Sequence, residues 1–156
     1  MKNAFVPLCF LLLSTVGATQ AQEVAVCRNP TGMGYYHFTA LLKEDSAGWE
    51  KEEITGGVFT LTRNDKGDLD ILYVDTRKKP VSSVSDGAIV RLLRRSEHSA
   101  TVLVHYPETS TELYTFFKEK NGANRFTLVQ SRTNGFIEKS SLMLGDCDNI
   151  DFPRLK

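Results

Sequence analysis

Three histidines are the side chains best suited to acid–base or metal chemistry in this sequence, and they are widely spaced. His37 and His105 fall in apolar, strand-like runs, and His98 falls in a polar turn. No pair has the His-x-His or His-x-x-x-His spacing of metal ligands. The spacing predicts no metal site, although histidines distant in sequence could still converge in the fold.

The segment 64–70 carries three aspartates, and Ca²⁺ prefers carboxylate ligands. Placing Gly67 at the invariant glycine of an EF-hand loop puts Thr62 and Lys66 at ligand positions, and neither supplies a carboxylate. We therefore interpret this segment as a polar hairpin turn.

Motifs for nucleotide binding and for a catalytic nucleophile are incomplete or missing. Gly32 and Gly34 begin like a dinucleotide-binding loop, but His37 stands where the third glycine belongs. No P-loop and no Gly-x-Ser-x-Gly elbow occurs. The sequence therefore predicts no catalytic residue and no cofactor.

Residues 1–21 have the layout of a secretory signal peptide. A charge at Lys2 precedes an almost wholly apolar run at 4–16, and Thr19 and Ala21 occupy the small-residue positions before a cut at Ala21–Gln22. The run is shorter than the roughly 20 residues that span a bilayer as a helix. We expect a periplasmic or secreted protein; cleavage after Ala18, a membrane anchor and a buried helix are the alternatives.

Cleavage leaves residues 22–156, the length of one domain, and we expect a single mostly-β domain with a loose C-terminal tail from about Asp148. The full chain has 19 basic and 19 acidic residues, and only Lys2 is lost among them. A net charge near zero predicts neither nucleic acid nor an anionic membrane as partner. No later segment is long and apolar enough to span a membrane.

Two cysteines, Cys27 and Cys147, remain after cleavage, near opposite ends of the mature chain. In an oxidising compartment an even pair predicts a disulfide. Two free buried thiols or a redox pair are the alternatives, but no Cys-x-x-Cys motif is present. Val26 is too bulky beside a lipidated cysteine, so we expect no lipid anchor at Cys27.

Short runs rich in β-branched and aromatic residues recur about every ten to twelve positions, separated by turn residues such as Asn134-Gly135. These runs predict strands at 35–42, 58–63, 69–75, 81–84, 88–94, 100–106, 112–118, 125–132 and 137–144.

Several of these strands are apolar on both faces, as at 100–106 and 69–75, so the sheet must be covered on both sides or curl on itself. Covering helices are scarce, and 46–54 is the best candidate for a short one. We predict an all-β, mostly antiparallel meander of about eight or nine strands that forms a small barrel or sandwich, with at most one short helix.

Aromatic side chains are abundant on the predicted strands, where most are expected to fill the core. Trp49 lies beside a charged segment and before Gly56-Gly57, which makes it the best candidate for an exposed anchor. With Tyr35 and Tyr36 it forms the candidate binding surface.

The segments CRNPTG at 27–32, AGW at 47–49 and GDC at 145–147 resemble landmarks of a family of small exported bacterial proteins that have no assigned activity. The resemblance covers most of the mature chain and implies a periplasmic or secreted setting.

The sequence thus predicts an exported binding protein, first as a non-catalytic protein-interaction module of the cell envelope. A carrier of a small apolar or lipid-like ligand in a curled β-sheet is the alternative, and an enzyme without a recognisable motif ranks third. An enclosed apolar cavity would favour the carrier, and a filled core with an exposed aromatic patch would favour the module.

Overall fold

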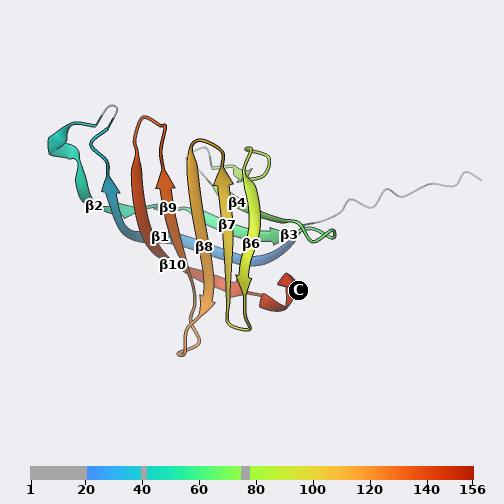
Figure 1. The fold of residues 1–156 in the computed structure, drawn as a ribbon. Coiled ribbons are helices and arrows are strands. Elements are labelled where there is room, and N and C mark those ends of the chain that lie inside the picture. The colour runs from blue at the N-terminus through green and yellow to red at the C-terminus, as the bar shows by residue number, and fades with distance from the viewer. Residues whose placement is uncertain (1–20, 40–41, 75–77) are drawn as a thin grey trace, which may run out of the picture.

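Ten strands form one curled, antiparallel sheet in the computed structural model, which describes residues 21–39, 42–74 and 78–156 (Figure 1). The predicted all-β fold is therefore confirmed. The predicted signal peptide, apart from Ala21, lies outside the described residues. The strands are β1 (Gln22–Tyr36), β2 (Gly48–Glu53), β3 (Val58–Arg63), β4 (Leu69–Val74), β5 (Pro80–Ser82), β6 (Ile89–Arg95), β7 (Ser99–Tyr106), β8 (Ser110–Lys118), β9 (Asn124–Arg132) and β10 (Lys139–Ile150).

The order across the sheet is β5-β4-β3-β1-β10-β9-β8-β7-β6, and β2 pairs only with β1. The two long strands β1 and β10 therefore lie side by side in its middle. Cys27 in β1 is directly opposite Cys147 in β10, and their sulfur atoms are bonded. The predicted cysteine pair thus joins the first and last strands of the sheet.

A bend in β1 lets one strand serve two neighbours. Its first half pairs with β3 and its second half with β2, and the register shifts between Arg28 and Thr31. Asn29 adopts a positive φ of 47° there, and its side-chain oxygen accepts a 2.9 Å hydrogen bond from the backbone N–H of Gly56. Pro30 follows, and its carbonyl accepts from Ile54. Bulges of this kind bend a strand and increase its twist.

Because the sheet curls, β3 and β4 lie over the inner face of β7–β9, and the hydrophobic core lies between them (Figure 1). The ring of Phe59 in β3 lies 5.9 Å from that of Tyr114 in β8 and 5.7 Å from that of Phe126 in β9. Leu61 and Ile71 are fully buried in the same core. Curling thus buries one apolar face of these strands, as at Ile71 and Val102, while outer side chains such as Leu103 are only half-buried.

Two predicted elements are wrong. The expected helix at 46–54 is a short 3₁₀ turn, Glu44–Ser46, followed by strand β2. Its Glu and Lys residues favour a helix locally, but pairing with β1 overrides that weak preference. The expected strand at 35–42 is instead the end of β1, which stops at Tyr36; residues 40–41 lie outside the described chain. The other predicted strands correspond to β3–β10, although Asp75 is not among the described residues.

The C-terminus is not the loose tail that the sequence suggested. Strand β10 continues to Ile150, and a 3₁₀ turn, η2 (Phe152–Leu155), buries Phe152 and Leu155 in the core. Arg154 fixes this turn by donating a 2.8 Å hydrogen bond to the carbonyl of Glu23. The turn closes the end of the curl that lies beside Leu69, at the beginning of β4.

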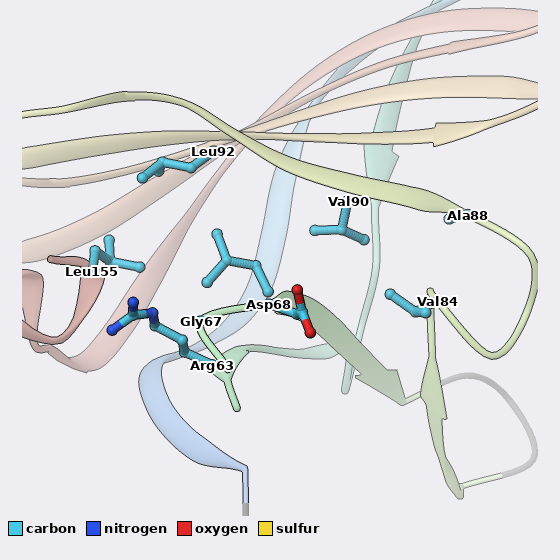
Figure 2. A pocket seen from close by; sticks show the side chains of 9 residues that line it. Arg63, Gly67, Asp68, Val84, Ala88, Val90, Leu92 and Leu155 are labelled. Carbon is cyan, nitrogen blue, oxygen red and sulfur yellow. The ribbon is translucent and has the colours of Figure 1, made fainter. Parts of the chain in front are cut away.

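The two ends of the sheet approach each other without a strand pair between β6 and β4 or β5 among the described residues. Figure 2 shows the cleft at this seam, where Val90 and Leu92 of β6 lie across from Arg63 and Asp68, with Leu155 beside them. Its volume is about 540 Å³. The sheet is therefore a half-barrel with a seam.

In the part of the chain that the structure describes, no helix has the length and apolar character needed to cross a membrane.

Candidate functional site

A hollow of about 1040 Å³ opens at the end of the curl opposite η2. It lies beside Tyr73 and Val74 at the end of β4, between the turns that join β2 to β3, β7 to β8 and β9 to β10. One end of the half-barrel is thus plugged by the C-terminal turn, and the other end is open.

Strand alternation places the side chains that line the hollow. Successive side chains of a strand point to opposite faces, so Ser110, Glu112 and Tyr114 of β8 share the inner face. Across the ladder, Glu112 pairs with Gln130 and Tyr114 pairs with Leu128 of β9. The floor of the hollow therefore combines aromatic and aliphatic groups with one carboxylate and one amide.

Glu112 is the central polar group of this floor, and it is only 8% exposed. Its Oε1 accepts a 2.7 Å hydrogen bond from Gln130 Nε2, and its Oε2 accepts a 2.7 Å hydrogen bond from the hydroxyl of Tyr114. Burial, followed by the neighbouring negative charge of Glu112, raises the pKa of Tyr114 well above its ordinary value. The tyrosine therefore remains a neutral donor that holds the carboxylate in place.

Two further tyrosines form a second polar group on the wall. The hydroxyl of Tyr73 donates a 3.0 Å hydrogen bond to Asp86 Oδ2. Burial raises the pKa of both Tyr73 and Tyr106, and the bond to Asp86 adds to the effect at Tyr73. The hollow is thus bordered by neutral hydroxyl groups as well as rings.

The rim of the hollow carries both apolar and charged side chains. In the loop that joins β9 to β10, Phe136 is 79% exposed and Ile137 is 47% exposed. Lys78 and Arg132 supply exposed positive charges at the mouth. No described cation forms an ion pair with Glu112. The buried carboxylate is therefore held by neutral donors alone among these residues.

A separate ion pair lies on the same sheet face, toward β2. Lys139 of β10 contacts Glu52 of β2, and the two side chains are 14% and 8% exposed. The Lys139 ammonium also lies 5.6 Å from the centroid of the Tyr36 ring. Burial lowers the pKa of Lys139. Gly34 makes room for Glu52, because a Cβ at this position would come within 2.6 Å of its Oε2. This pair fastens β2 to the sheet.

The predicted binding surface is only partly assembled. Trp49 is 67% exposed, and its ring meets that of Tyr35 edge-on at 5.4 Å. Tyr36 lies on the opposite face, beside Lys139. The convex face continues from Tyr35 to the exposed side chains of Met33 and Leu142, which are paired across β1 and β10.

Sequence reasoning missed Glu112 and Gln130 as site residues. A usable signal was present: Tyr114 and Phe116 were expected to be core aromatics, and Glu112 precedes them with the same period of two. A glutamate on the inward face of a core strand predicts a satisfied buried carboxylate. The partner Gln130 could not be assigned without the register of β8 and β9.

The described residues contain no group of three or more His, Cys, Asp or Glu side chains placed to hold a metal ion. His37 and His105 instead contact Ser140 and Thr111 at 3.4 and 3.1 Å. No protein-family model, no curated protein and no solved structure matches this chain significantly.

Proposed function

We propose that this is an exported, non-catalytic binding protein that holds a small, largely apolar ligand in the hollow of its curled sheet. The observation that supports this proposal most is the hollow. Small-molecule sites are concave, mostly apolar, and contain a few convergent polar groups that orient the ligand. The rings of Phe59 and Tyr114 with Leu128 supply the apolar part, and Glu112 and Gln130 supply the polar groups.

Export is supported by the signal-peptide layout of residues 1–21 and by the bonded cysteine pair, since such bonds persist in oxidising compartments. Strand β1 begins at Gln22, so cleavage after Ala21 would remove no residue of the sheet.

Two adjacent positions of β8 test the proposal. Ser110 lines the hollow, whereas Thr111 points to the convex face, so Ser110→Trp fills the mouth and Thr111→Trp is its matched control. The neutral apolar dye N-phenylnaphthylamine should fluoresce more strongly with the wild type and Thr111→Trp than with Ser110→Trp. Equal enhancement by all three proteins, or none by any, would count against binding in the hollow.

A second candidate is the protein-interaction module, which one observation favours. An exposed tryptophan braced by a neighbouring tyrosine is a common interface anchor, and Trp49 with Tyr35 has that arrangement. Trp49→Ala should then weaken retention of a protein partner in an envelope extract and leave dye binding unchanged.

A further inference from the structure

We propose that the hollow recognises a cationic ligand, an organic ammonium ion with an apolar body, and that Glu112 is its counter-ion. This rests on the proposed function, because it names the chemical class of ligand for the same hollow.

The first argument concerns the hydrogen-bond partners of the Glu112 carboxylate. A buried charge is costly unless it is paired, and among the described residues the two groups that hydrogen-bond to Glu112, the Gln130 amide and the Tyr114 hydroxyl, are both neutral. A carboxylate offers about four acceptor positions, and these two bonds occupy two of them. Glu112 also lines the hollow, so its remaining acceptor positions and its charge are available to a ligand there.

The second argument is the ring content of the walls. Phe59, Tyr73, Tyr106 and Tyr114 all line the hollow around Glu112. Aromatic rings attract cations through their quadrupole, and the attraction grows when the cation is desolvated. Rings beside a carboxylate are how proteins commonly hold ammonium groups, and the same rings accept an apolar body.

Two positive charges at the mouth of the hollow would instead favour an anionic ligand. Arg132 is opposite Ser110, the residue two positions before Glu112, and Lys78 lies on the same rim. Both side chains are exposed, however, so water screens their charge, whereas the charge of Glu112 is largely removed from water. The buried group should therefore dominate selection among ligands of equal size.

Three probes of one size and different charge test this inference: octylammonium, octanol and octanoate. Their dissociation constants are measured by calorimetry, and isotope-labelled protein shows by chemical shift whether each probe lies in the hollow. Octylammonium should bind most tightly. Glu112→Gln should weaken octylammonium about 10-fold to 100-fold and change octanol little. Glu97→Gln, which removes an exposed carboxylate in the β6–β7 turn, is the matched control and should change neither. Arg132→Gln should tighten octylammonium, because it removes a like charge.

The outcomes separate the two proposals. If octanol binds in the hollow as tightly as octylammonium, or Glu112→Gln leaves both unchanged, the hollow binds ligands but not by their positive charge. If octanoate binds best and Arg132→Gln abolishes its binding, the ligand class is anionic. If no probe shifts the resonances of hollow residues, the proposed function fails as well. Should Glu112→Gln not fold, the order of the three probes on the wild type still decides the charge preference.

Discussion

Cys27 and Cys147 are direct cross-strand partners, and their bond fastens β1 to β10 in the middle of the sheet. Strand β1 also carries the bulge between Arg28 and Thr31, where it turns from β3 to β2 beside β10. The bond therefore fixes the strand pair from which both wings of the half-barrel extend.

Loss of this bond should lower stability strongly. It closes a loop with a sequence separation of 120 residues, for which chain entropy predicts about 4–5 kcal/mol as an upper figure. Thermal unfolding with and without reductant measures the effect, and size-exclusion chromatography should show the same species before and after reduction. Free thiols found by alkylation of the exported, unfolded protein would contradict a disulfide bond between Cys27 and Cys147 in the mature protein.

Truncation of two aromatic side chains should change the free energy of unfolding by very different amounts. Phe126→Ala should cost about 3–5 kcal/mol of unfolding free energy, because Phe126 is fully buried against Phe59 and Phe116. Trp49→Ala should change stability by about 1 kcal/mol or less, because the tryptophan is mostly exposed. Urea unfolding of both variants measures this. A large loss for Trp49→Ala would show that Trp49 is a core residue.

The C-terminal turn should contribute to stability although it is only four residues long. Phe152→Ala removes a ring that plugs the closed end of the curl and should cost about 3 kcal/mol. Lys156→Ala, at an exposed neighbouring position, is the control and should cost almost nothing. Equal stability of the two variants by urea unfolding would restore the idea of a loose tail.

Alkaline pH should destabilise the fold through the tyrosines of the hollow. The folded-state pKa of Tyr73, Tyr106 and Tyr114 lies above the ordinary value of 10.0, so the folded state binds more protons than the unfolded state above that pH. Their contribution is fully present below pH 10 and is lost as pH rises through the folded-state pKa values.

Lys139 acts in the opposite direction and at lower pH, because its pKa is lowered from 10.5; stability should rise from its folded-state pKa up to about that value, whereas the three tyrosines act above 10.0. Urea unfolding at a series of alkaline pH values should show falling stability, and Tyr114→Phe should show a shallower fall. A pH-independent unfolding free energy through this range would contradict the burial of these hydroxyl groups.

Local signals in the sequence were sufficient to predict the strands that pair with their neighbours in the sequence. The run 58–63 and the turn after it are recovered as β3 and a hairpin, where Gly67 has a φ of 91° and the Asn64 side chain accepts from Lys66 and Asp68. In such hairpins the same few residues set both the turn and the register.

The features that the sequence did not predict depend on pairing between residues that are distant in the sequence. In β1, Asn29 and Pro30 suggest a break, and only contacts with Gly56 and Ile54 reveal a bulge within a continuous strand. The charged run in β2 becomes a strand only because β1 offers an unpaired edge. The same limit applies to the hollow, since Phe59, Asp86 and Glu112 meet there only after the sheet has curled.

Ligand binding in the hollow is tested most directly by a chemical-shift titration of isotope-labelled protein with N-phenylnaphthylamine. Binding there should shift the backbone resonances of Phe59, Glu112 and Gln130, which line the hollow on β3, β8 and β9. Those of Trp49 and Tyr35, on the convex face, should stay in place. Shifts centred on Trp49 and Tyr35, or no saturable shift at the hollow residues, would contradict the hollow as the binding site.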